Sequence, residues 1–158
     1  MQAQEIFDKL KEQFGESIIS LTDTAPSDAF IIVAGGNLFD ICQYLRDTDG
    51  MEFDYLVNLS ALDLGENLAS VYHFYSMNLQ HRIVLKVIVP KDNPSVPSVE
   101  TIWRTADWME REAFDMMGII YEGHHNLIRI LSPYDWEGYP LRKDYVTPEE
   151  YHGMRVPY

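Results

Sequence analysis

The spacing of hydrophobic residues switches between a helical and a strand period along this chain. Apolar residues recur every three or four positions over residues 2–14 and again between Asn37 and Asp49, which predicts two amphipathic helices. Elsewhere short runs are rich in β-branched and aromatic residues or alternate with polar ones, which predicts strands. These runs cover residues 17–21, 30–33, 53–60, 69–77 and 82–89.

The order of these elements indicates the fold class. A helix, two strands, a second helix and three strands follow one another, and the last two connections are short enough for hairpins. Such an order favours helices packed on one face of a largely antiparallel sheet, an α+β two-layer domain. We expect this domain to cover residues 1–131 and an extended C-terminal arm to cover residues 132–158.

A third helix is predicted after the proline-containing connector at residues 91–98. Ser98 offers an N-cap oxygen and Gly118 a left-handed exit, so we expect the helix between them. Its apolar residues share one face at helical spacing. They are Val99, Ile102, Trp103, Ala106, Met109, Ala113 and Met117.

The charges of this third helix are ordered as well. Glu110 falls inside the apolar arc, where a carboxylate needs a cation. We therefore expect Glu110 to be buried and paired with a cation, most simply Arg129 or Arg142. Lys143 is a third candidate, because it lies in the same segment that must fold back over the helix. The opposite side carries a second face that we expect to be covered too, with a ladder of alternating charge along it. That face consists of Arg104, Trp108, Arg111 and Asp115, and the ladder of Asp107, Arg111 and Asp115.

The C-terminal arm combines prolines with aromatic residues. Its four prolines resist helix and sheet, yet six Tyr and Trp residues between Tyr134 and Tyr158 are too many for a solvated tail. We therefore expect an extended arm lying on a surface, either on its own domain or on another chain. Arg142 and Lys143 also allow a second interpretation, a site for a small anionic ligand. The acidic residues beside them would compete with such a ligand for the two cations.

Other candidate chemistry is weakly supported by the sequence. Glu110, Glu112 and Asp115 do not converge at helical spacing, so an acid/base site is disfavoured. Adjacent histidines on a strand point to opposite faces, so His124 and His125 are not expected to share a metal, and a hydrogen-bonded structural His124 is favoured.

The composition excludes several further classes of function. The net charge of −13 and sequence pI of about 4.6 argue against nucleic acid and against direct docking on an anionic bilayer. The single cysteine, Cys42, cannot by itself hold a cluster. No apolar run approaches the length of a membrane span, and the start of the chain does not resemble a signal peptide.

Several motifs carry a resemblance to a known family. They are WMEREAFDMMGI at 108–119, GHHNLIRIL at 123–131 and DWEGYPLRKDY at 135–145. Together they resemble the C subunit of the proton-pumping NADH–quinone oxidoreductases, respiratory complex I. The length and the run LASVYH at 68–73 are also similar to the short homologue in photosynthetic complex-I-like enzymes.

The resemblance implies a function and partners. It implies a non-redox scaffold without a cofactor of its own, with flavin, iron–sulfur clusters and quinone in partner subunits. It implies packing against the D subunit, which forms the quinone site with the B subunit, and a peripheral place on the cytoplasmic side of the inner or a thylakoid-like membrane. The alternative is a stand-alone soluble ligand-binding domain that uses Arg142 and Lys143.

The resemblance also assigns residues. The signature and its structural ion pairs comprise Glu110, Arg111, Glu112, Asp115, Gly118, His124, Arg129, Arg142 and Lys143. The expected subunit interface comprises Arg104, Trp108, Trp136, Tyr139, Pro140, Leu141, Asp144 and Tyr145. No catalytic, cofactor-binding or metal residue is expected in this chain.

Overall fold

The computed structural model describes residues 1–24 and 28–156. Pro26, in the turn expected between the strand runs 17–21 and 30–33, and Pro157 and Tyr158 of the arm lie outside the described residues. The three α-helices are α1 (Ala3–Phe14), α2 (Leu38–Asp47) and α3 (Ala106–Met117). Two short 3-10 helices, η1 (Gly15–Ser17) and η2 (Gly35–Asn37), follow α1 and precede α2. The strands are β1 (Ile18–Thr22), β2 (Phe30–Val33), β3 (Tyr55–Asp63), β4 (Asn67–Tyr75), β5 (Arg82–Pro90), β6 (Ser95–Pro97), β7 (Ile120–Glu122), β8 (Glu150–Tyr151) and β9 (Met154–Arg155).

The main sheet has five strands in the order β1-β2-β5-β4-β3. The meander β3-β4-β5 is antiparallel throughout, and β1 pairs antiparallel with β2. The two parts join through a parallel pair in which Phe30 of β2 lies opposite Val84 of β5. The predicted α+β architecture with a largely antiparallel sheet is therefore confirmed, because among the described strands of the main sheet only β2 and β5 pair in parallel.

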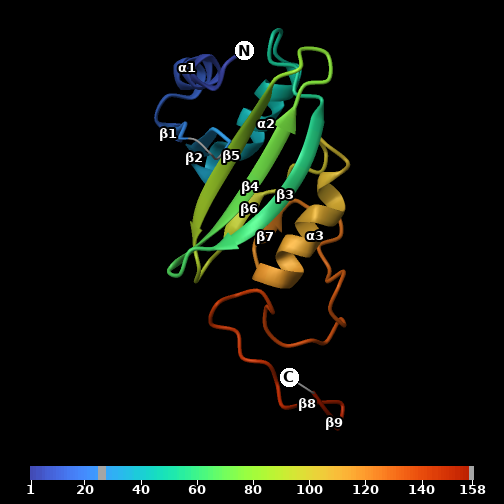
Figure 1. The fold of residues 1–158 in the computed structure, drawn as a ribbon. Coiled ribbons are helices and arrows are strands. Elements are labelled where there is room, and N and C mark those ends of the chain that lie inside the picture. The colour runs from blue at the N-terminus through green and yellow to red at the C-terminus, as the bar shows by residue number, and fades with distance from the viewer. Residues whose placement is uncertain (25–27, 157–158) are drawn as a thin grey trace.

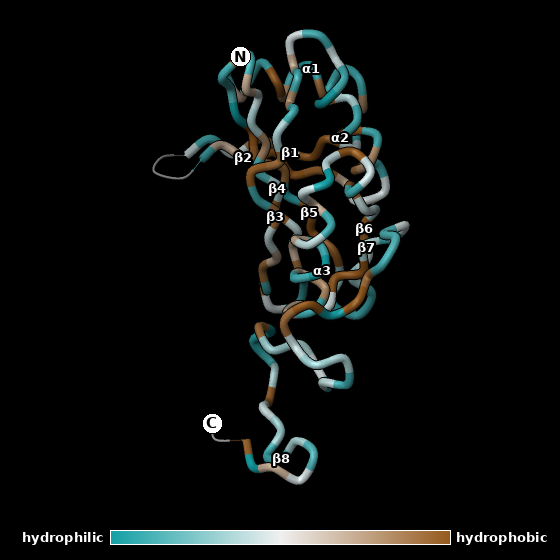
Figure 2. Tube along the Cα trace, turned by 90° about the vertical axis from the view of Figure 1, so that its right-hand side faces the viewer, coloured by the Kyte–Doolittle hydropathy of each residue, from teal (hydrophilic) through white to brown (hydrophobic). Residues whose placement is uncertain are grey.

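Helices α2 and α3 and the small pair β6–β7 lie on one side of the sheet, and α1 crosses one end beside β1 (Figure 1). The hydrophobic core lies between these elements and the sheet, and the same layering is seen edge-on in Figure 2. Side chains of α1 and α2 enter this core at helical spacing, as the sequence predicts. Their buried residues are Ile6, Leu10, Leu38, Ile41, Cys42 and Leu45.

The third helix is shorter than predicted. It begins at Ala106, with Thr105 at the N-cap, so Ser98 does not cap it. Residues 98–105 instead form turns held by tertiary contacts, and the indole Nε1 of Trp103 donates to the carbonyl of Phe53 at 3.0 Å. The helix ends as predicted at Gly118, which is left-handed with φ of 74°.

The predicted proline connector contains a strand that the sequence did not indicate. Ser95–Pro97 forms β6 and pairs in parallel with β7, which directly follows α3. The hydroxyl of Ser95 also donates to the carboxylate of Glu122. Strand β6 lies beside η2 and α2. The turns of residues 98–105 therefore run between two fixed elements, β6 before them and α3 after them.

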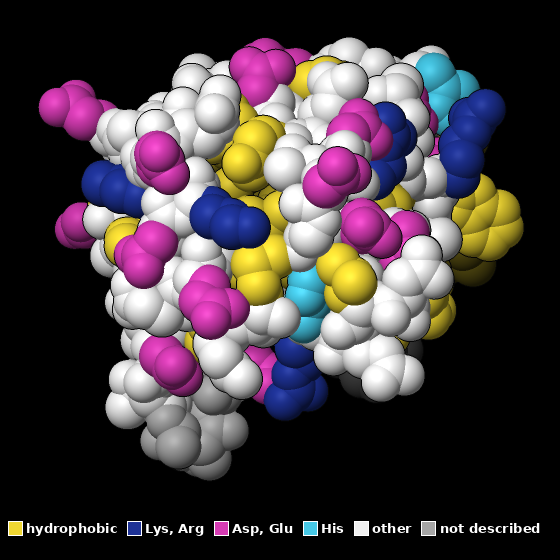
Figure 3. Space-filling view, turned by 90° about the horizontal axis from the view of Figure 1, so that it is seen from above, with side chains coloured by type: hydrophobic (Ala, Val, Ile, Leu, Met, Phe, Trp, Pro, Cys, Tyr) yellow, Lys and Arg dark blue, Asp and Glu magenta, His cyan; other side chains and the backbone are white. Residues whose placement is uncertain are grey.

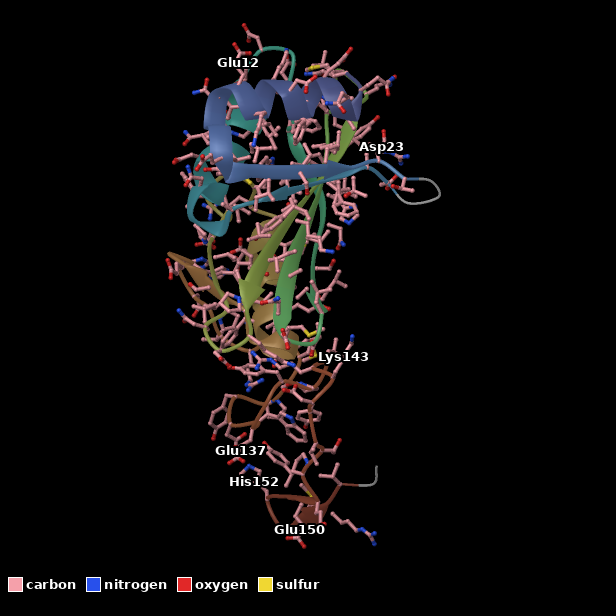
Figure 4. All side chains as sticks on the ribbon, turned by 90° about the vertical axis from the view of Figure 1, so that its left-hand side faces the viewer. Glu12, Asp23, Glu137, Lys143, Glu150 and His152 are labelled. Atoms are coloured by element: carbon pink, nitrogen blue, oxygen red, sulfur yellow. The ribbon has the colours of Figure 1, made fainter. Side chains whose placement is uncertain are left out.

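The arm leaves the domain below the C-terminal end of α3 (Figure 1). Figure 4 shows Lys143 next to the lower end of the sheet, whereas Glu137, His152 and Glu150 lie progressively farther from it. The far end of the arm contains a short antiparallel hairpin, β8–β9, in which each strand has two residues. None of the described helices is long and apolar enough to cross a membrane.

Candidate functional site

Glu110 lies in the middle of α3 and is fully buried, as its helical position predicts. Its carboxylate accepts hydrogen bonds from the hydroxyl of Ser98 at 2.6 Å and from the backbone N–H of Val99 at 2.8 Å. The expected ion pair with Arg129 or Arg142 is wrong, because both guanidinium groups bind elsewhere. The helix start at Ala106 explains the difference: residues 98 and 99 are free to fold back and donate to Glu110.

The environment of Glu110 favours its protonated form. Burial raises the pKa of the carboxyl to about 7, although the hydrogen bonds from Ser98 and Val99 act in the opposite direction. The nearby carboxylates of Glu100 and Asp107 raise it further. Glu110 is thus a buried acid that holds its proton more tightly than an ordinary glutamic acid.

His124 lies among these three acids, with its side chain fully buried. Its Nε2 is 3.1 Å from the carbonyl oxygen and 3.2 Å from Oδ1 of Asp107, 3.5 Å from Glu100 and 4.0 Å from Glu110. Its Nδ1 accepts the backbone N–H of Asn126 at 3.0 Å. In the neutral ring Nε2 must therefore carry the proton and donate toward the acids. This agrees with a hydrogen-bonded structural His124.

The neighbouring His125 is turned toward the same cluster. Both its backbone N–H and its Nδ1 lie 2.6 Å from the carboxylate of Glu100, and its ring stacks on that of His124 with 5.2 Å between centroids. The expectation that the two rings point to opposite faces is wrong. It assumed a strand, whereas the chain turns after Gly123, where φ is 83°.

This cluster has the composition of a metal site but not its hydrogen-bond pattern. One ligand atom from each of Glu100, Asp107, His124 and His125 lies within 4.8 Å of the others. A metal on Nε2 of His124 would need the lone pair there, which places the ring proton on Nδ1, facing the N–H of Asn126. Two donors would then oppose each other. The geometry fits a hydrogen-bonded network that joins α3 to the turns on both sides of it.

Asp115 forms the second buried carboxylate centre. It accepts from Arg129 at 2.8 Å and from the backbone N–H groups of Ile130, Leu131 and Ser132 at 3.1, 2.7 and 2.8 Å. Burial alone would raise its pKa, but these donors outweigh it and lower the pKa to about 2. Asp115 therefore fixes the path of the chain as it leaves the domain.

The predicted second face of α3 is only partly formed. Trp108 is 68% exposed and Arg104 is exposed, but Asp115 is fully buried, so it does not belong to this face. The predicted charge ladder is also wrong, since Arg111 donates to the carbonyls of Ile128 and Arg129 and Asp107 faces His124. Glu112 is exposed beside the groove between α3 and β3, apart from Glu110 and Asp115. The three acids do not converge, as the sequence predicts.

The near half of the arm, residues 138–144, is bound to the domain. Leu141 N–H donates to the carbonyl of Met116 at 3.0 Å, and Arg142 Nε donates to that of Met117 at 2.7 Å. These bonds satisfy carbonyls that the end of a helix leaves free. The Arg142 guanidinium also stacks on Tyr139, 4.5 Å from its ring centre. Arg129 donates to the carbonyl of Gly138 at 2.8 Å.

Gly118 makes this approach possible. A Cβ at this residue would lie 2.5 Å from the ring of Tyr139 and 2.7 Å from Arg142. The glycine therefore serves both the left-handed helix end and the close packing of the arm.

Asp63, at the end of β3, is an anchor that the sequence patterns did not indicate. It accepts from the backbone N–H of Lys143 at 2.8 Å, from Gly65 N–H at 2.8 Å and from Lys91 Nζ at 3.0 Å. These donors hold its pKa far below the usual range. Lys91 also pairs with Asp144 at 3.2 Å. The sequence signal was an aspartate two residues before a glycine, a spacing typical of a turn that uses the side chain.

The far half of the arm, residues 145–156, binds mainly to the arm itself. Asp135 accepts from Tyr151 and lies 2.7 Å from Nε2 of His152, and Trp136 donates to the hydroxyl of Tyr145 at 3.0 Å. These contacts close residues 133–137 and 145–156 into a hook, and none of these residues belongs to the hydrophobic core. The hook and the segment leading to it expose large apolar side chains, with Tyr134 93% and Val146 84% exposed, together with Leu131, Leu141 and Met154.

Two solved structures share this fold. One, titled Nqo5 of the trypsin-resistant fragment (1-134), aligns with a TM-score of 0.66 and 23% identity over 80% of this chain and 100% of that chain. Another, titled as the membrane-bound sulfane sulfur reductase, an archaeal respiratory membrane complex, aligns with a TM-score of 0.75 and 21% identity over 92% of this chain and 86% of that chain. At these identities the likeness establishes the fold.

Sequence relatives establish the family. The model of the respiratory-chain NADH dehydrogenase 30 kDa subunit matches residues 31–151. The C subunit of NADH-quinone oxidoreductase from Chloroherpeton thalassium is 45% identical over 94% of this chain and 63% of its own length. The C subunit from Chlorobium phaeobacteroides is 41% identical over 99% of this chain and 96% of its own length, and that from Saccharopolyspora erythraea is 42% identical over 90% and 59%.

The chain therefore belongs to the family of the 30 kDa subunit, also called the C subunit, of respiratory-chain NADH dehydrogenase. It spans less than two thirds of the length of two of these relatives and nearly all of the third.

Proposed function

We propose that this chain is a non-redox scaffold in the peripheral arm of a proton-translocating NAD(P)H– or ferredoxin–quinone oxidoreductase. It braces the subunits that form the quinone site, chiefly the D and B subunits. The observation that carries the proposal is the arm, whose near half is clamped to α3 and Asp63 while the hook projects large exposed apolar side chains. Such side chains on a structured projection are typical of an interface.

The described chemistry supports a scaffold over a catalyst. Cys42 is buried, and burial raises the pKa of its thiol, which disfavours the thiolate needed for a cluster. The two fully buried carboxylates of α3, Glu110 and Asp115, are engaged by Ser98, Val99 and the chain at 129–132. We infer that flavin, iron–sulfur clusters and quinone are held by partner subunits, and that the chain is peripheral on the cytoplasmic side of the membrane.

The alternative ligand site at Arg142 and Lys143 is less well supported. The guanidinium of Arg142 is engaged by Met117 and Tyr139, and the backbone N–H of Lys143 by Asp63. A shallow hollow between Gly138 and Val146 also contains Glu137 and Asp144, whose charges would repel an anion. These groups stabilise the arm and leave few donors for a ligand.

Deletion of residues 147–158 should separate assembly from folding. The deletion removes residues 147–156 of the hook, including the strands β8 and β9, but none of the contacts of residues 138–144 with the domain. We expect the thermal midpoint of the isolated chain to change little and co-purification of the D subunit from native membranes to fall about tenfold. Deletion from Ser132 should also lower the midpoint, because it removes Leu141, Arg142 and Lys143 from their acceptors.

Leu79→Ala is a matched control, since Leu79 is an exposed apolar residue in the turn between β4 and β5, at the opposite end of the molecule from the arm. It should leave both readouts unchanged. Full retention of the D subunit by the longer deletion would contradict the proposal and would move the interface to Arg104, Trp108 and Arg111.

The purified chain should be colourless and redox-silent. A single buried cysteine leaves the chain without the four thiolates that an iron–sulfur cluster needs. Visible spectra and elemental analysis of the protein isolated under anaerobic, native conditions provide the measurement. Iron, flavin or another chromophore bound near one equivalent would refute the scaffold assignment.

A further inference from the structure

The face of the main sheet that points away from α2 and α3 is covered by no described helix or strand below α1 (Figures 1 and 2). Strand register defines its residues, because directly paired residues share a face. The rows across it are Phe30–Val84–His73–Asn58, Ile32–Lys86–Val71–Ser60, Ile88–Ala69–Leu62 and Arg82–Tyr75–Tyr55. We call these residues the open face.

The open face is an apolar surface separate from the core. Ala69, Val71 and Val84 are buried among their neighbours, yet they do not belong to the core cluster. Around them Ile88 is 40% exposed, and Tyr55 and Leu62 are exposed to a similar degree. A contiguous patch of this kind is typical of a protein contact.

The charge on the open face is opposite to that of the chain. The chain carries 25 acidic and 12 basic residues, and acidic side chains are spread over the end of the molecule seen in Figure 3. None of the open-face residues defined above is acidic, whereas Arg82, Lys86 and His73 are among them. Exclusion of acids from one apolar face favours an electronegative partner.

The position of Lys86 indicates which chemical group the partner must supply. It lies on the central strand β5, between Ile32 and Val71, with its ammonium 5.3 Å from the ring centre of Phe30. Arg82 already pairs with Asp28 at 2.9 Å, but no carboxylate of the described residues forms an ion pair with Lys86. A cation in the middle of an apolar surface needs a carboxylate once water is excluded.

A second copy of this chain does not meet that requirement. A two-fold contact through the open face would bring the two Lys86 ammonium groups toward each other, because Lys86 is near the middle of the face. Like charges in a desolvated interface are strongly unfavourable. The occupant must therefore be a different chain.

We propose that the open face binds an apolar segment of another protein subunit, whose carboxylate pairs with Lys86. The proposal rests on the proposed function, since it takes the partner from the same complex, but it adds a second interface on the side of the sheet opposite α3.

Site-specific photo-crosslinking in the full chain tests the contact. A benzoylphenylalanine at Ile88 should crosslink to another subunit in native membranes. The same residue at Ile120, an equally exposed isoleucine on β7, is the matched control and should not give that product. A third probe at Tyr134 reports on the arm. Crosslinking from Tyr134 with none from Ile88, or an Ile88 product that joins two copies of this chain, would overturn the open-face proposal alone. Silence at Tyr134 and Ile88 together would overturn the proposed function as well.

Charge reversal tests the carboxylate. Lys86→Glu should lower the amount of assembled complex about tenfold, whereas Lys86→Arg should keep it near the wild-type level. The thermal midpoint of the isolated chain should change little in both variants, since no described carboxylate pairs with Lys86 and its one ring contact, with Phe30, is 5.3 Å long. Normal assembly of Lys86→Glu would refute the paired carboxylate.

Discussion

Replacement of Asp115 by alanine is expected to lower the free energy of unfolding by about 3–5 kcal/mol. The carboxylate is fully buried and neutralises Arg129, whose side chain is only 13% exposed. It also accepts the three backbone N–H groups of residues 130–132. Alanine leaves a cation and three backbone donors without this acceptor. Urea unfolding followed by circular dichroism measures the loss.

Glu112→Ala is the matched control, because Glu112 is an exposed acid on the same helix. Its effect should stay within about 0.5 kcal/mol. Asp115→Asn should be intermediate, since the amide keeps one acceptor oxygen but loses the charge. A loss below about 1 kcal/mol for Asp115→Ala would show that water replaces the carboxylate.

Acid should mimic the Asp115 substitution. The pKa is lowered to about 2 in the folded chain, so the stabilisation is complete above the ordinary pKa of 3.8 and is lost as the pH falls toward 2. This contribution should be missing from the pH profile of Asp115→Asn.

The wild-type protein is expected to lose stability as the pH rises toward neutral, and replacement of Glu110 by glutamine is expected to abolish this loss. The folded pKa of about 7 exceeds the ordinary value of 4.5, so the folded state binds more protons between these values and stability falls as the pH rises through them. A shift of this size corresponds to about 2–3 kcal/mol between pH 4.5 and pH 8. Glutamine resembles the protonated acid: its oxygen can accept from Val99 and its amide can donate to Ser98.

The measurement is the free energy of unfolding of both proteins across that pH range. The difference between wild type and Glu110→Gln should change in favour of the glutamine variant as the pH rises. Glu110→Ala should be destabilised by about 3 kcal/mol at pH 4.5, because it opens a cavity and leaves the Ser98 hydroxyl and Val99 N–H unsatisfied. Its deficit should shrink toward pH 8, where the wild type has itself lost the contribution of the protonated acid. A difference independent of pH would show that folding does not shift the pKa of Glu110.

The strands of the main sheet could be predicted from the sequence, because the alternation of residues that defines a strand lies within the strand itself. β2 occupies the predicted residues, and β5 ends one residue later than expected, since alternation of Ile83, Leu85, Val87 and Val89 is already enough to define one buried face. The third helix was extended too far for a related reason. Val99, Ile102 and Trp103 have helical spacing, but they are held in turns by Glu110 and Phe53, which are distant in sequence.

The ion pairs were predicted less well than the burial. Helical phase correctly indicated that Glu110 is buried, but it cannot show which of several following groups reaches it. Arg129 instead meets Asp115, one turn farther along α3, and backbone donors take the place expected for a cation. The contact between Asp63 and Lys143 joins residues eighty positions apart, so no local pattern contains it.

The parallel pairing of β2 with β5 has a consequence for the order of folding. Strands β3, β4 and β5 are joined by short turns, so their contacts close small loops and can form early. The β1–β2 hairpin leaves the ribosome early, directly after α1, yet its partner strand β5 follows only after α2, β3 and β4. The sheet should therefore grow from its C-terminal strands outward, with the N-terminal hairpin added last. During synthesis the apolar edge of β2 has to wait for β5, which makes this hairpin the part of the nascent chain most dependent on protection from aggregation.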